Sequence, residues 1–168
     1  MLPVYQAIIK CLSDRIGMAI TLTVGDDDYR QFSECDLAFI CGLTYVLRTP
    51  PYVPTASHEA FAAPIPAGAR YQGQPIYYSD VIVRADSPYQ HFADLRGASW
   101  AFNEPESQSG YGVTRYHLVQ MGETNGFFGK VVQAGFHQTA LHWVANGEID
   151  AAAIDTLVLA VEMEAHPR

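Results

Sequence analysis

The chain has 168 residues, of which 49% are hydrophobic and 17% are charged, a composition that fits one ordinary globular domain or two small ones. Its formal net charge is −8 and it has no run of Lys or Arg, so we expect no nucleic acid as a partner, because the mean field of the chain repels one. No stretch approaches the ~20 apolar residues that cross a bilayer, and the N-terminus lacks the basic region and apolar core of a signal peptide, so we expect no direct membrane insertion.

The first half of the chain is predicted to mix helices and strands, from the spacing of its apolar residues. Helices are expected at 3–16, at 26–32 and around 45–47. Strands are expected at 18–24 and 36–41, and an extended segment at 59–65. Between them, the prolines that follow residue 49 end regular structure.

The second half of the chain alternates more regularly. Strands are expected at 76–84, 99–102, 130–133 and 149–154. Helices are expected at 91–95, 110–121, 137–146 and 156–164. Strands that alternate with helices imply an α/β fold, with a mostly parallel sheet and helices on its faces. The strand at 76–84 is the best candidate for a boundary between two units.

The sequence favours neither a metal site nor a cofactor. The three cysteines, Cys11, Cys35 and Cys41, have no metal-binding spacing, and we interpret them as free, buried thiols. His137 and His142 are five residues apart, about 140° around a helix, so they do not form a chelating pair.

A serine-containing loop is the first candidate for a binding site. Residues 104–110 follow a predicted strand and open a predicted helix, at the end of a parallel sheet where ligands bind. Ser107 and Ser109 offer hydroxyl donors, and the N–H groups of Gln108, Ser109 and Gly110 are expected to remain free in the first helical turn. Such donors suit a tetrahedral oxyanion. The alternative is an ordinary helix capped by serine.

Two further residues stand at the same kind of strand-to-helix turn. His137 begins a predicted helix and offers a ring nitrogen to a ligand, unless it is a surface or capping histidine. Asp155 ends an apolar strand, where its carboxylate accepts a hydrogen bond from a protonated oxyanion or pairs with a ligand amine, unless it only caps the next helix.

Three tyrosines are weaker candidates, because tyrosines more often fill cores than bind ligands. These are Tyr45 and the pair Tyr77 and Tyr78. Adjacent residues of a strand face opposite sides, so only one of the pair is able to point into a given cleft.

Catalysis has little support, and we expect no enzyme. The chain has no Gly-x-Ser-x-Gly elbow and no cysteine on a recognisable catalytic loop. An enzyme that uses His137 and Asp155 as an acid/base pair is the least favoured alternative.

Six segments taken together resemble the phosphate, phosphite and phosphonate-binding proteins of ABC transporters, the PhnD-like family. The segments are Asp36-Leu-Ala-Phe-Ile-Cys-Gly-Leu-Thr-Tyr45, Tyr77-Tyr-Ser-Asp-Val-Ile-Val-Arg-Ala-Asp-Ser87, Asp94-Leu-Arg-Gly-Ala-Ser-Trp-Ala-Phe102, Glu104-Pro-Glu-Ser-Gln-Ser-Gly-Tyr111, Gly135-Phe-His-Gln-Thr-Ala-Leu141 and Asn146-Gly-Glu-Ile-Asp-Ala-Ala-Ala-Ile-Asp155. They stand in the family's order and span nearly the whole chain.

The resemblance implies a type II periplasmic-binding fold, in which two α/β lobes close on a ligand at a hinge cleft. Residues 1–79 would form a first lobe that is incomplete, and residues 80–168 the second. The resemblance places Tyr45, and Tyr77 or Tyr78, on the cleft from the first lobe and hinge. It has Ser107, Gln108 and Ser109 cradle the ligand's oxygens, and His137 and Asp155 close the far side.

The implied function is the extracytoplasmic solute-binding component of an ABC importer, which captures a small oxyanion such as phosphonate, phosphite or phosphate. In the full-length protein its partner would be an ABC permease, and its location the periplasm or another extracytoplasmic space. The alternative is a ligand-sensing domain of the same fold in a signalling or regulatory protein.

Two departures from the family pattern concern the pocket. Members usually have Ser-Thr-Ser where this chain has Ser107-Gln108-Ser109, and Ser-His where it has Phe136-His137. The true ligand is therefore expected to differ from a simple phosphonate. The chain also resembles a member truncated at both ends, so we expect exposed apolar surface and marginal stability in residues 1–75.

Overall fold

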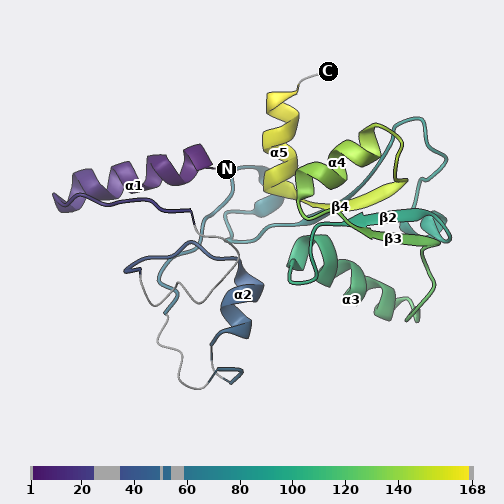
Figure 1. Cartoon of the computed structure of the whole chain (residues 1–168), viewed down its shortest axis with the longest axis horizontal. Coiled ribbons are helices and arrows are strands. Elements are labelled where there is room, and N and C mark those ends of the chain that lie inside the picture. Colours follow the sequence, from purple (N-terminus) through teal and green to yellow (C-terminus); the bar gives the residue numbers. More distant parts are fainter. Residues whose placement is uncertain (1, 25–34, 50, 54–58, 167–168) are drawn as a thin grey trace. The chain divides into compact units, whose positions relative to one another are not determined.

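The structure is a computed structural model that describes residues 2–24, 35–49, 51–53 and 59–166. It divides into two compact units, Met1–Ile40 and Cys41–Arg168 (Figure 1). The long helix α1 belongs to the first unit, and the strands that the structure describes all belong to the second.

The first unit is built around one helix. α1 spans Leu2–Ile16, which confirms the helix predicted at 3–16. Ile9 is buried on this helix, and the centroid of the Tyr5 ring lies 4.9 Å from that of Phe39. This ring contact packs the end of the first unit against the helix.

The two strands predicted in the first half of the chain are wrong. Residues 18–24 and 36–41 run without strand pairing. Their apolar alternation favours a strand, but a strand is stable only where a neighbour completes its hydrogen bonds, and no described residue pairs with either segment. The helix predicted at 26–32 lies outside the described residues. Residues 59–65 form neither helix nor strand.

A four-stranded sheet in the order β1-β4-β2-β3 forms the centre of the second unit. The strands are β1 (Ser79–Val83), β2 (Ser99–Phe102), β3 (Lys130–Gln133) and β4 (Ala151–Asp155), which confirms the four predicted in this half. β2 runs parallel to β3 and β4, but β1 runs antiparallel to β4, so the sheet is mixed. β1 is shorter than predicted because its partner β4 ends at Asp155, opposite Ser79.

The helices predicted in the second unit are confirmed with small changes in length and type. The α-helices are α2 (Gly42–Leu47), α3 (Val113–Gln120), α4 (His137–Ala145) and α5 (Thr156–Ala165). Among the described residues of this unit, the further helical segments are two 3₁₀ turns, η2 (Ala69–Tyr71) and η3 (Phe92–Leu95), and one π-helical turn, η4 (Gln108–Gly112). The helix predicted at 110–121 therefore begins as the wide turn η4 and continues as α3.

Strand β4 is buried on both faces, which explains its unbroken apolar sequence. Ala151 and Ala153 belong to the core cluster that includes Leu118 of α3. Ala152 and Ile154 belong to the opposite cluster, which α4 and α5 cover. Figure 1 shows α3 on one side of the sheet and α4 with α5 on the other. The sheet is thus held between two helical layers, with its strand ends left for loops.

The cysteines differ in part from expectation. Cys11, Cys35 and Cys41 keep their thiols, as predicted, but all three are exposed rather than buried. The strand predicted at 36–41, which would have ended at Cys41, does not form. In the part of the chain that the structure describes, no helix has both the length and the apolar character needed to cross a membrane.

Apolar side chains are exposed through the first 75 residues, as predicted. They include Ile16, Met18, Val24, Phe61 and Ile65. Exposure of so many large apolar groups removes much of the hydrophobic free energy that stabilises an ordinary domain.

Candidate ligand-binding site

Three strand-to-helix turns lie at one edge of the sheet. Because β2, β3 and β4 are parallel, their carboxyl ends point the same way, toward η4, the start of α4 and the start of α5. The Oγ of Ser109 lies 3.2 Å from Nε2 of His137, and η4 packs against β4. The edge therefore brings together the serine turn, the histidine and the strand that ends in Asp155.

Ser107 caps η4. Its Oγ accepts the N–H of Gly110 at 3.0 Å, so that N–H is not free, contrary to the sequence-based expectation. The Ser107 carbonyl accepts from Tyr111 and Gly112, at 3.1 and 2.9 Å, which closes the wide first turn. The helix-cap alternative thus holds for this hydroxyl, which keeps its own hydrogen to donate.

Gln108 lies along its own helix. A Cβ on Gly112 would stand 2.6 Å from Oε1 of Gln108, so the glutamine amide occupies the space that this glycine leaves open. The side chain is exposed. The extra bulk relative to threonine is accommodated by Gly112.

Gly110 allows the closest approach in the site. A Cβ at this position would overlap Oδ1 of Asn103 and stand 3.1 Å from Cε1 of His137. Asn103 directly follows β2 and is only 7% exposed, and its Oδ1 has no hydrogen-bond partner among the described residues. Sequence reasoning missed Asn103, although a polar residue directly after an apolar strand was a usable signal.

His137 is a neutral imidazole at neutral pH. Burial lowers its pKa, and the Asp155 carboxylate, which raises it, offsets only part of that effect. Nε2 faces the Ser109 hydroxyl. A neutral ring in this position donates or accepts according to its tautomer.

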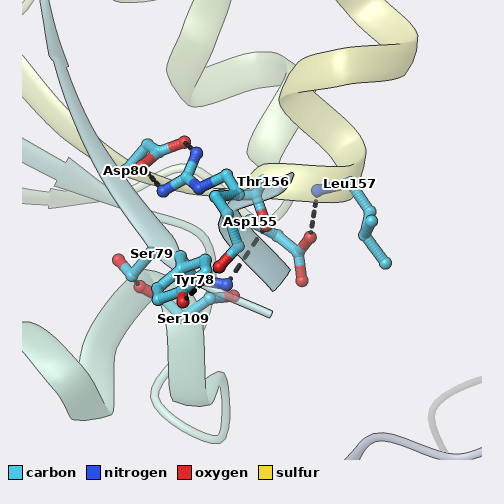
Figure 2. A network of polar contacts seen from close by, with 8 residues as sticks. Tyr78, Ser79, Asp80, Ser109, Asp155, Thr156 and Leu157 are labelled. Carbon is cyan, nitrogen blue, oxygen red and sulfur yellow. Dashed lines mark hydrogen bonds and ion pairs between the residues drawn. The ribbon is translucent and has the colours of Figure 1, made fainter. Parts of the chain in front are cut away.

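Asp155 caps α5 and also acts on the site through its charge. Its Oδ1 accepts the N–H groups of Leu157 and Val158, at 2.7 and 3.4 Å, and Figure 2 shows the first of these bonds. The cap alternative is therefore correct, and it leaves Oδ2 outside the cap. The same carboxylate raises the pKa of His137, so the two roles coexist.

The two adjacent tyrosines face different groups. Tyr77 is 38% exposed, and partial burial of its hydroxyl, followed by the charges of Asp155 and Cys41, raises its pKa. The hydroxyl of Tyr78 donates to the Arg70 carbonyl at 2.9 Å, and the Arg70 guanidinium lies 4.5 Å from the ring centroid. Tyr77 is thus the member of the pair on the side of Asp155.

Tyr45 makes a different contact. Its hydroxyl accepts the N–H of Ala60 at 3.3 Å. Nearby Cys41, the N-cap residue of α2, is exposed as a residue, but partial burial of its thiol, followed by the carboxylates of Asp155 and Glu104, raises its pKa. Sequence reasoning did not propose Cys41 as a site residue, since a free cysteine before a short helix carries no specific signal.

The chemistry of this edge is that of hydrogen-bond donors beside carboxylates. Ser109, His137 and Tyr77 supply hydroxyl or ring donors, and Asp155 and Glu104 supply negative charge. Within the described ranges, no group of three His, Cys, Asp or Glu side chains has the geometry to hold a metal ion. Such an edge is able to bind a group that carries both oxygen atoms and protons.

Two cavities lie elsewhere in the second unit. One of about 290 Å³ lies against α3 and is lined by Trp100 and Phe127, among others, and one of about 930 Å³ lies between β1, α4 and α5. Neither is lined by Ser109, His137 or Asp155. The candidate site is therefore separate from both of these cavities.

An α/β domain with polar turns at the carboxyl ends of its strands is a common architecture for small-molecule binding. This chain belongs to a family of such proteins: the model described as "ABC transporter, phosphonate, periplasmic substrate-binding protein" matches residues 1–168. The match confirms the resemblance found in the sequence.

The proteins similar to this chain include a curated relative and two solved structures. The Phosphonates-binding periplasmic protein of Escherichia coli (strain K12) is 29% identical over 164 residues, which cover 92% of this chain and 46% of the relative. This chain thus spans less than half the length of that relative. The structure of XAC2383 from Xanthomonas citri bound to ATP is 23% identical to this chain, and the match covers 48% of this chain and 34% of XAC2383. The structure of the same protein bound to chloride ion is 22% identical, and the match covers 48% of this chain and 33% of XAC2383. The TM-score is 0.44 in both cases.

Proposed function

We propose that this chain forms part of the extracytoplasmic solute-binding component of an ABC importer and captures a small oxyanion such as phosphonate, phosphite or phosphate. The proposed fold is of type II, with a partial first lobe at 1–79 and a second lobe at 80–168 that close on the ligand. In the full-length protein an ABC permease is the proposed partner, and the periplasm or another extracytoplasmic space the proposed location. Family membership supports each of these proposals.

One observation carries the proposal for the site: the Oγ of Ser109 lies 3.2 Å from Nε2 of His137, and both adjoin the strand that ends in Asp155. In the tautomer in which Nε2–H donates to Oγ, the Ser109 hydroxyl keeps its own hydrogen to donate to an oxygen of a tetrahedral group. The N–H groups of Gln108 and Ser109, in the first turn of η4, add backbone donors, because helix geometry supplies them no acceptor.

Charge narrows the ligand class. The carboxylates of Asp155 and Glu104 repel a fully ionised dianion. They favour a ligand that presents a proton or an ammonium group toward them. Tyr77, beside Asp155, fits the same part of the ligand as a hydroxyl partner. The proposed ligand is therefore a protonated oxyanion or an amine-bearing phosphonate.

A calorimetric titration of the full chain tests this proposal. Methylphosphonate, phosphite, phosphate and sulfate form the first series, and ethylphosphonate with 2-aminoethylphosphonate form a matched pair that differs by one amine. We expect binding without turnover, with the amine-bearing member of the pair bound more tightly. Absence of binding to every compound, or product formation from any of them, would refute the proposed function.

A further inference from the structure

We propose that Ser79 is a positioning residue for the candidate ligand-binding site: its hydroxyl holds the turn that carries Ser109 and so sets the contact between Ser109 and His137. This inference rests on the proposed function, because it describes how that same site is held together.

The bond from Ser79 joins two separate elements. Ser79 is the first residue of β1 and lies opposite Asp155 in the register with β4. Its Oγ donates to the Ser109 carbonyl at 2.6 Å, and Figure 2 shows the two residues together. Ser109 is only 4% exposed, and Ser79 is half-buried. A hydrogen bond that short and partly shielded fixes the backbone of the serine turn relative to the sheet.

Ser79 is itself fixed by both of its neighbours. The Tyr78 N–H donates to Oγ1 of Thr156 at 3.2 Å, and the Thr156 N–H donates to the Tyr78 carbonyl at 3.1 Å. On the other side, both carboxylate oxygens of Asp80 accept from Arg70, each at 3.0 Å. Three consecutive residues thus connect to α5, η4 and η2 in turn (Figure 2), and the Ser79 hydroxyl has little freedom to move.

The serine turn also contacts His137. Ser109 approaches its ring nitrogen, and Gly110 lies against the same ring and Asn103. The turn therefore contacts Ser79 through the Ser109 carbonyl and His137 through the Ser109 hydroxyl. Without the Ser79 hydroxyl, we expect the serine turn to shift. The N–H groups of Gln108 and Ser109 would then no longer point at the ligand, and water would reach His137.

The test uses Ser79→Ala in the full chain with methylphosphonate as the probe. Calorimetry should give about five- to tenfold weaker binding, the loss expected for one buried hydrogen bond. In the ligand-free protein, NMR titration should show the pKa of His137 rising toward its ordinary value, because burial now holds it down. Ser79→Thr, which keeps a hydroxyl, should restore both properties.

Ser99→Ala is the matched control. The Ser99 Oγ also donates a 2.6 Å hydrogen bond, to Asp150, but Ser99 begins β2 and so lies at the end of that strand away from the candidate site. We expect this control to lower stability while leaving the affinity and the His137 titration unchanged. If Ser79→Ala does not fold, Ser79→Cys replaces it, since a thiol keeps the size and weakens the donor.

The outcomes separate this inference from the proposed function. Wild-type affinity and an unchanged His137 titration in the Ser79 variant would overturn the positioning role, as would an equal loss of affinity in Ser99→Ala. If no form binds methylphosphonate but only the Ser79 variant alters the His137 titration, the positioning role stands and the proposed ligand class fails.

Discussion

Among the residues of the site, His137 is the one whose protonation state depends most on its surroundings. It combines a buried ring, a serine hydroxyl at 3.2 Å and a neighbouring carboxylate, and the burial lowers its pKa despite the carboxylate. A histidine in this state is neutral when free, and an anion bound beside it would favour the protonated form. Two consequences follow, one for stability and one for binding.

The stability of the chain should fall on acidification partly because of His137. The ordinary pKa of histidine, about 6.5, applies to the unfolded chain, and the folded value is lower, so between the two values the unfolded state binds more protons. The contribution of His137 is fully present above pH ~6.5 and is lost as the pH falls toward the folded pKa. Urea unfolding between pH 5 and 7.5 should show a smaller dependence on pH in His137→Gln than in the wild type. An equal pH dependence would contradict the lowered pKa.

Gly110 should tolerate no side chain. Gly110→Ala places a methyl group against the buried Asn103 side chain and close to the His137 ring, so we expect a loss of about 1–3 kcal/mol in the free energy of unfolding. Gly42→Ala is the matched control, because a Cβ there meets nothing within 4 Å. Chemical denaturation of both variants measures the difference. Equal stability of the two would show that the site relaxes around Gly110 at no cost.

At the scale of elements, each turn of the site serves its own helix as well as the ligand. Ser107 caps η4 and Asp155 caps α5. The same two residues that indicated a binding site in the sequence therefore also stabilise the helices that they begin. A substitution at either position therefore affects both helix capping and ligand binding, and its effect on stability has to be measured beside its effect on affinity.

Asp155 allows such a separation. Asp155→Ala removes the acceptor for the N–H groups of Leu157 and Val158 and should cost about 1 kcal/mol of stability. Asp155→Asn keeps an acceptor, so stability should change little, whereas the charge beside His137 is lost. Urea unfolding followed by circular dichroism compares the two variants. A loss in the asparagine variant as large as in the alanine variant would contradict the capping role.

Much of the second unit could be predicted from the sequence, and much of the first could not. The apolar run before Asp155 identifies β4 by itself, because a strand buried on both faces needs no polar alternation. Residues 18–24 have a similar local pattern but no partner in the described part of the chain. A strand forms only where a neighbouring strand pairs with it, and the local sequence pattern does not show whether such a neighbour exists.

The candidate site shows the same division. The positions of Ser109, His137 and Asp155 at strand ends followed from the sequence alone. The choice between Tyr77 and Tyr78 did not, because it depends on Arg70, which draws Tyr78 to its own side. The role proposed for Ser79 depends on a contact across 30 residues, which no local pattern indicates.

At the scale of the whole molecule, stability should be unevenly distributed. The side chains of Ala151, Ala152, Ala153 and Ile154 in β4 are fully buried, whereas on α1 only Ile9 is buried among the side chains described. Hydrogen exchange followed by mass spectrometry should therefore show slow exchange in β2 and β4 and fast exchange in α1. Protection of α1 equal to that of β4 would contradict the marginal stability expected for residues 1–75.

The binding affinity of His137→Ala tests the central claim most directly. If the serine turn, His137 and Asp155 together hold an oxyanion, calorimetric titration with methylphosphonate should show at least tenfold weaker binding than in the wild type, about 1.4 kcal/mol, with an unchanged circular-dichroism spectrum. An unchanged affinity in the folded variant would remove His137 from the site and contradict the account.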